Sequence, residues 1–155
     1  KKTASLFCSC VQVGGYAAGA PEDQLRDLMA YAELLGICFQ IKDDIFDYFD
    51  NKEVGKPTGN DLREGKMTLP LIYALSKTDA PRHSEMVELS HKDILEPSDI
   101  ATLIEYAKEQ GGIDYAYARM EQLKQQADEI ISRLPHSESL DAFRMIFSYI
   151  ISRRY

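Results

Sequence analysis

The sequence contains few cysteines, and their spacing does not match a disulfide framework. Cys8, Cys10 and Cys38 are odd in number, and Cys8-Ser9-Cys10 lacks the CxxC spacing of zinc-binding pairs. This excludes a small disulfide-stapled scaffold and predicts a reducing, cytoplasmic setting. We interpret all three cysteines as small packing residues.

Positive charge and long apolar runs are also scarce. The sequence has 18 lysines and arginines against 25 aspartates and glutamates, which gives a net charge of -7. Without a basic stripe carrying interleaved aromatic residues, neither nucleic acid nor an anionic membrane surface is expected as a partner. No apolar run approaches the roughly 18 residues of a membrane-spanning helix, so no stable membrane insertion is expected.

Strand signals are absent as well, and the pattern is helical throughout. Helical periodicity and capping signals predict helices over residues 1–19, 22–50, 68–75, 96–110 and 113–134, a last helix after Ser137, and at most one short helix within 79–91. The predicted fold class is therefore all-α, and 155 residues fit one domain. No Ser/His/Asp, Cys/His or HExxH arrangement is visible.

The residues that indicate chemistry lie near the end of the expected helix 22–50. Four of them fall within roughly 60° of one helix face at about 100° per residue: Gly36, Gln40, Asp43 and Asp47. Aspartate is a poor helix former and like charges one turn apart repel, so carboxylates that continue a core-facing stripe indicate a functional site. A hard cation would offset the repulsion, and carboxylate oxygens suit Mg²⁺, which keeps several waters and also binds substrate phosphates.

A solvated acidic surface is the alternative interpretation of this DDxxD cluster. The apolar flanks, together with Gln40 one turn earlier, favour the metal site. An EF-hand loop that starts at Asp50 is excluded, because its third and fifth positions would be Lys52 and Val54 rather than oxygen ligands.

Residues 51–66 form a turn-rich segment that follows the cluster. Its glycines, proline and asparagine are typical of a loop. The segment also holds four basic residues: Lys52, Lys56, Arg63 and Lys66. Two interpretations stay open, because the spacing fits both surface ion pairs of little energetic weight and contacts to an anion that the metal also holds.

Taken in order, these residues resemble the trans-isoprenyl diphosphate synthases. Four motifs carry the resemblance: Lys2-Thr3 on a helix, the GxxxQxxDDxxD pattern from Gly36 to Asp47, Gly55-Lys56-Pro57, and the stretch from Gly59 to Pro70. The loop reads GKPxGNDLxEGKxTLPL. With Leu71-Ile72 it is more similar to the long-chain, octaprenyl-type members than to the farnesyl or geranylgeranyl ones.

The resemblance implies an all-α isoprenoid-synthase bundle around a central cavity. It also implies a prenyltransferase that condenses isopentenyl diphosphate with an allylic diphosphate head to tail, usually as a homodimer. By the same resemblance, Asp43 is the chief Mg²⁺ ligand, and Asp44 and Asp47 support it through direct or water-mediated contacts.

Five further site residues are carried over from the family motifs. The resemblance implies that Lys2, Lys56 and Lys66 neutralise the allylic diphosphate. It also implies that Thr3 and Gln40 line the site near the reactive end of the prenyl chain.

The sequence also departs from the family pattern. Members are about twice as long, and their first aspartate-rich motif lies upstream of the position of Lys2. The chain also starts as if inside a helix, without a cap. We therefore expect residues 1–155 to be the C-terminal half of a polyprenyl synthase domain, inactive on its own.

Three alternatives remain. The first is a non-catalytic subunit of a heteromeric prenyl synthase. The other two are enzymes that use this fold for terpene cyclisation or for head-to-head condensation. The intact DDIFD and GKPxGNDLxEGK patterns argue against these.

At the C-terminus, Arg153 and Arg154 either help to close the site or form a plain exposed basic end.

Overall fold

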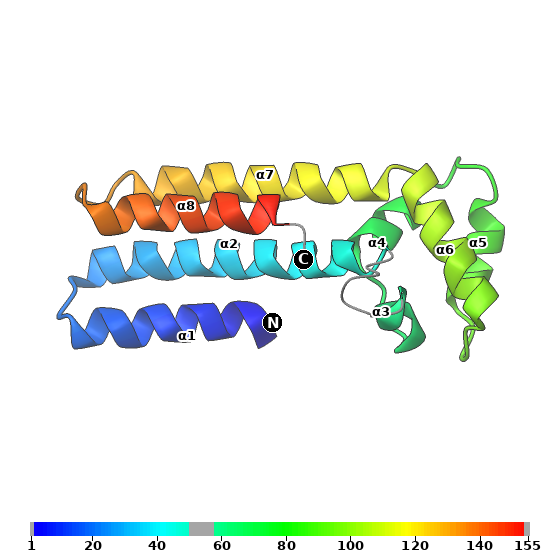
Figure 1. Cartoon of the computed structure of the whole chain (residues 1–155), viewed down its shortest axis with the longest axis horizontal. Coiled ribbons are helices and arrows are strands. Elements are labelled where there is room, and N and C mark those ends of the chain that lie inside the picture. Colours follow the sequence, from blue (N-terminus) through cyan, green and yellow to red (C-terminus); the bar gives the residue numbers. More distant parts are fainter. Residues whose placement is uncertain (1, 50–57, 154–155) are drawn as a thin grey trace. The chain divides into compact units, whose positions relative to one another are not determined.

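The computed structural model describes residues 2–49 and 58–153. Within these ranges the chain forms eight helices and no strand (Figure 1). The helices are α1 (Lys2–Ala17), α2 (Glu22–Phe46), α3 (Asn60–Arg63), α4 (Leu69–Leu75), α5 (His83–Ser90), α6 (Pro97–Glu109), α7 (Gly112–Ile131) and α8 (Glu138–Ser152). The expected all-α class is thereby confirmed.

The chain divides into two compact units, residues 1–42 with 119–155 and residues 43–118. In the first unit, α1, the main part of α2, the later part of α7 and α8 lie side by side (Figure 1). The rings of Phe7 on α1 and Phe39 on α2 are 5.8 Å apart. No residue of α1 is fully buried. In this unit the buried residues at the contact between α1 and α2 therefore belong to α2, and α1 is an outer helix that packs on it.

Tyr31 joins α2 to α8 in the same unit. Its ring packs edge-on against Phe143 and Phe147, at centroid distances of 5.4 and 5.9 Å. Its hydroxyl donates a hydrogen bond of 2.6 Å to the carbonyl oxygen of Phe143. Because only 1% of Tyr31 is exposed, burial is the main cause that raises the pKa of its phenol, and the negative charge of Asp128 adds to it.

Tyr31→Phe is expected to destabilise the chain by about 1 kcal/mol at neutral pH, because a buried hydrogen bond is lost. The folded state favours the neutral phenol, so this contribution is fully present below pH 10, near the ordinary tyrosine pKa, and is lost as the pH rises further. Urea unfolding of both proteins between pH 7 and 11 checks this. If the difference in free energy of unfolding between wild type and Tyr31→Phe grew above pH 10, this prediction would be wrong.

The second unit has its own apolar core. Helix α4 packs against α6, and α5 contacts both. The buried cluster consists of Tyr48, Leu62, Leu71, Ala74, Met86, Ile100, Leu103, Ile104, Tyr106 and Ala107. Local signals set the helix starts: Pro70 occupies the first turn of α4, and Glu96 with Asp99 forms a capping box at α6.

The structure differs from several expectations. Helix α2 ends at Phe46 rather than near residue 50, so Asp47 lies in the turn that follows. The segment expected to be only a loop contains α3, whose four residues are too few to show helical periodicity. The packing role holds for Cys38, which is buried, but is wrong for Cys10, which is exposed.

Each helix formed by the described residues is too short or too polar to span a lipid bilayer.

Candidate functional site

Asp43 and Asp44 lie in the last turn of α2. Both are half-buried, and α2 has no basic residue in its last turn. The carboxyl end of a helix carries partial negative charge, so two adjacent carboxylates are unfavourable there unless positive charge is supplied nearby. Two hard oxygen donors at such a helix end are compatible with a bound divalent cation.

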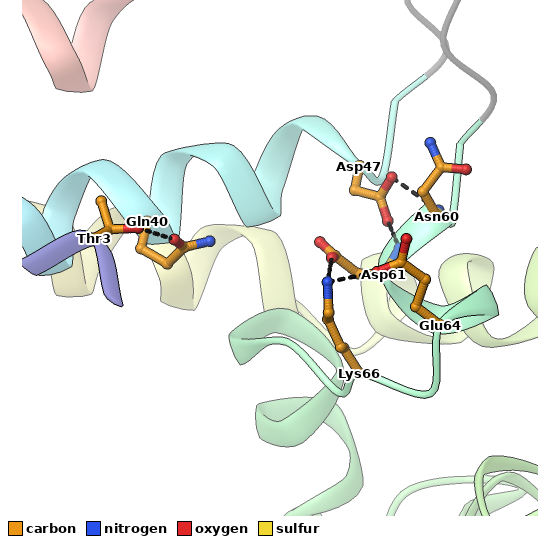
Figure 2. A network of polar contacts seen from close by, with 7 residues as sticks. All are labelled: Thr3, Gln40, Asp47, Asn60, Asp61, Glu64 and Lys66. Carbon is orange, nitrogen blue, oxygen red and sulfur yellow. Dashed lines mark hydrogen bonds and ion pairs between the residues drawn. The ribbon is translucent and has the colours of Figure 1, made fainter. Parts of the chain in front are cut away.

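Asp47 binds the backbone of the segment that contains α3. Its Oδ1 accepts a hydrogen bond from the amide of Asn60 and its Oδ2 accepts one from the amide of Asp61, both at 2.9 Å. The backbone carbonyl of Asp47 accepts a third bond, 2.9 Å long, from the amide of Gly59. These contacts join the end of α2 to the start of α3 (Figure 2).

Lys66 follows α3 and forms ion pairs within the same segment (Figure 2). Its Nζ lies 2.6 Å from Oε2 of Glu64 and 3.4 Å from Oδ1 of Asp61. The hydrogen bond that Lys66 donates to Glu64 is the main cause that raises the pKa of Lys66, and it lowers the pKa of Glu64 in return. Because these pairs are exposed they contribute little stability, so an incoming anion could displace the carboxylates readily.

The remaining predicted residues lie in the first unit or outside the described ranges. The hydroxyl of Thr3 on α1 donates a hydrogen bond of 2.8 Å to Oε1 of Gln40 on α2 (Figure 2). Lys2, at the start of α1, is exposed. Lys56 lies outside the described residues. The structure thus joins Thr3 to Gln40, and separately joins Asp47 to the segment of Lys66.

Asp61 is a site residue that the sequence reasoning missed. Its amide binds Asp47 and its carboxylate pairs with Lys66, so it links two residues that were singled out. The available signal was a carboxylate five positions before a lysine inside the loop motif.

The C-terminal end of α8 is held against α2 in the first unit. Lys42, which is only 3% exposed, donates a hydrogen bond of 2.8 Å to the carbonyl of Ile151. The guanidinium of Arg153 lies 4.1 Å from the centroid of the Phe39 ring. A plain exposed basic end is therefore wrong for Arg153, while Arg154 lies outside the described residues.

The acidic residues fit Mg²⁺ as a partial ligand set. Among the described residues, no group of three or more histidine, cysteine, aspartate or glutamate side chains is arranged to hold a metal ion. Mg²⁺, however, is commonly bound by one or two carboxylates together with waters and substrate phosphates. Asp43 and Asp44 provide that number of hard oxygen donors, whereas both oxygens of Asp47 already accept backbone hydrogen bonds.

Comparison with known proteins relates this arrangement to a family. Residues 1–107 match the family model described as polyprenyl synthetase. Heptaprenyl diphosphate synthase component 2 of Geobacillus stearothermophilus is 34% identical over 159 residues, which cover 100% of this chain and 48% of that relative. The chain spans about half the length of the curated relatives it matches.

Among the solved structures that are similar in fold, two carry the comparison. A geranylgeranyl pyrophosphate synthase from Bacteroides thetaiotaomicron has a TM-score of 0.89 and 42% identity, over 97% of this chain and 50% of that one. One from Corynebacterium glutamicum, complexed with calcium and isoprenyl diphosphate, has a TM-score of 0.85 and 31% identity, over 98% and 47%. The expected isoprenoid-synthase fold is confirmed, and the chain belongs to the polyprenyl synthetase family.

Proposed function

We propose that this chain forms the allylic diphosphate-binding wall of a polyprenyl diphosphate synthase. The reaction is the head-to-tail condensation of isopentenyl diphosphate with an allylic diphosphate. The observation that carries the proposal is the pair Asp43 and Asp44 at the negative end of α2, in a chain of this family. The C. glutamicum synthase binds a divalent cation together with an isoprenyl diphosphate, which supports Mg²⁺ as the cofactor here.

In this proposal Asp43 and Asp44 hold Mg²⁺, and Asp47 supports them from the turn. Bound there, Mg²⁺ would neutralise charge that develops on the diphosphate as it leaves. Lys66 binds diphosphate oxygens by exchanging its contacts with Asp61 and Glu64. Lys2 and Lys56 are proposed for the same task on the basis of the family resemblance.

Thr3 and Gln40 have a different proposed role. Their hydrogen bond fixes the orientation of the Gln40 amide on α2. A fixed polar pair can line the site without admitting loosely bound water, which would otherwise capture an allylic cation.

The state of assembly has two candidates. The resemblance favours a homodimer. The relative named component 2 of a heptaprenyl diphosphate synthase favours assembly with a different subunit, catalytic or not. A long-chain product and a cytoplasmic location remain predictions. Light scattering of the isolated chain, alone and mixed with candidate subunits, distinguishes the two assemblies.

Asp43→Asn is expected to weaken Mg²⁺-dependent diphosphate binding by at least about 10- to 100-fold, the usual cost of disturbing a metal site. The measurement is calorimetric titration of the chain with Mg²⁺ and a non-hydrolysable allylic thiolodiphosphate. Asp79→Asn is the matched control, because Asp79 is exposed and carries the same charge.

Two outcomes would contradict the proposal. The first is the absence of binding by folded wild-type chain. The second is an equal loss of binding in Asp43→Asn and Asp79→Asn. Turnover of allylic and isopentenyl diphosphates at an ordinary enzymatic rate would contradict the separate expectation that the chain is inactive alone.

A further inference from the structure

Three consecutive backbone amides bind Asp47. The amides of Asn60 and Asp61 donate to its two carboxylate oxygens, and the amide of Gly59 donates to its backbone carbonyl, all at 2.9 Å. Helix α3 has no side-chain cap of its own. Asp47 therefore supplies acceptors that the sequence around α3 does not provide.

Tyr48 holds the other end of the same segment. Its hydroxyl is hydrogen-bonded to that of Thr68 at 2.8 Å, and the two residues are only 2% and 7% exposed. Two consecutive residues after α2 thus bind both ends of residues 59–68.

The segment between these anchors is hydrogen-bonded as one piece. The amide of Lys66 donates to the carbonyl of Asp61 at 2.8 Å, and the amide of Arg63 donates to that of Gly59 at 3.0 Å. The side chain of Lys66 pairs with Asp61 and Glu64 (Figure 2). A displacement of the amides at Asp47 would therefore move the ammonium of Lys66 as well.

We propose that Asp47 is a positioning residue that sets the place of Asp61 and Lys66, with Tyr48 as the second anchor, rather than a ligand of the metal. The inference rests on the proposed function, since the anion that Lys66 meets is a diphosphate. It separates the three aspartates into two that face the cation and one that fixes the anion-binding segment.

Asp47→Asn tests the inference in the full 155-residue chain. Asparagine keeps the size but has a single acceptor oxygen, and its amide nitrogen would face a backbone N–H. Hydrogen exchange measured by NMR is expected to be about tenfold or more faster at the amides of Asn60 and Asp61. In Asp43→Asn, exchange at these amides is expected to stay unchanged.

A binding experiment separates positioning from ligation. In titrations with Mn²⁺ alone, Asp47→Asn is expected to match wild type while Asp43→Asn binds more weakly. In titrations with inorganic pyrophosphate at saturating Mn²⁺, Asp47→Asn is expected to lose about tenfold in affinity, as expected for one displaced charged contact. A merely structural role would leave pyrophosphate affinity intact in molecules that remain folded.

Either of two results overturns the inference: Asn60 and Asp61 amides that stay protected in Asp47→Asn, or an Mn²⁺ affinity that falls as far as in Asp43→Asn. If Asp47→Asn does not fold, Tyr48→Phe leaves every carboxylate in place and is expected to weaken pyrophosphate but not Mn²⁺ binding; unchanged pyrophosphate binding overturns the inference. Wild-type chain that binds neither probe refutes the proposed function, while the exchange data still decide whether Asp47 anchors the segment.

Discussion

Gly59→Ala is expected to lower the free energy of unfolding by about 2 to 5 kcal/mol. Gly59 has a φ of 73°, in the left-handed region that costs residues with a Cβ about 1 to 2 kcal/mol. An added Cβ would also overlap the Cγ2 atom of Ile100 in the core of the second unit. Urea unfolding measures the total, and exchange of the Asn60 amide reports whether the contact with Asp47 is lost.

Gly65→Ala is the matched control for that substitution. Gly65 has the same φ of 73°, but nothing lies within 4 Å of the position its Cβ would occupy. Gly65→Ala is therefore expected to lower the free energy of unfolding only by the cost of the left-handed backbone conformation, about 1 to 2 kcal/mol. The steric part should disappear in an Ile100→Ala background, as a double-mutant cycle would show. Equal costs at Gly59 and Gly65 would contradict the steric argument.

Gly36→Ala is expected to push α1 away from α2. The new Cβ would collide with the backbone of Ala4 on α1, which cannot yield as a flexible side chain would. The cost of such overpacking, about 1 to 3 kcal/mol, exceeds the helix-propensity gain of about 0.5 to 1 kcal/mol. We expect lower thermal stability, faster amide exchange along α1 and loss of the hydrogen bond between Thr3 and Gln40.

Gly14→Ala, in the same pair of helices, is expected to raise rather than lower the free energy of unfolding. Gly14 lies within α1, and nothing is within 4 Å of the position of its Cβ. Only the propensity gain remains, so a stabilisation of about 0.5 to 1 kcal/mol is expected. A stabilisation by Gly36→Ala of the same size would show that the helices do not approach closely at Gly36.

The candidate site was only partly predictable from the sequence. The adjacent carboxylates Asp43 and Asp44 stood out because they break local helix rules, and that conflict is visible in one stretch of chain. Helical spacing groups Asp47 with them only if the helix continues beyond Phe46. The helix ends there, and the partners of Asp47 lie 13 and 14 positions further along the chain. No periodic pattern reports such a contact.

Apart from α3 and the end of α2, the sequence by itself determined the described helices and the position of the aspartate cluster. Caps and periodicity are local properties, and Ser137 indeed caps α8 by accepting a hydrogen bond from the amide of Leu140. Only the tertiary structure decided which residues from distant segments form hydrogen bonds with one another. The burial of Lys42, for example, is explained by its hydrogen bond to the carbonyl of Ile151, which lies 109 positions away in the sequence. Hydrogen bonds between distant segments depend on packing directions, which local sequence does not encode.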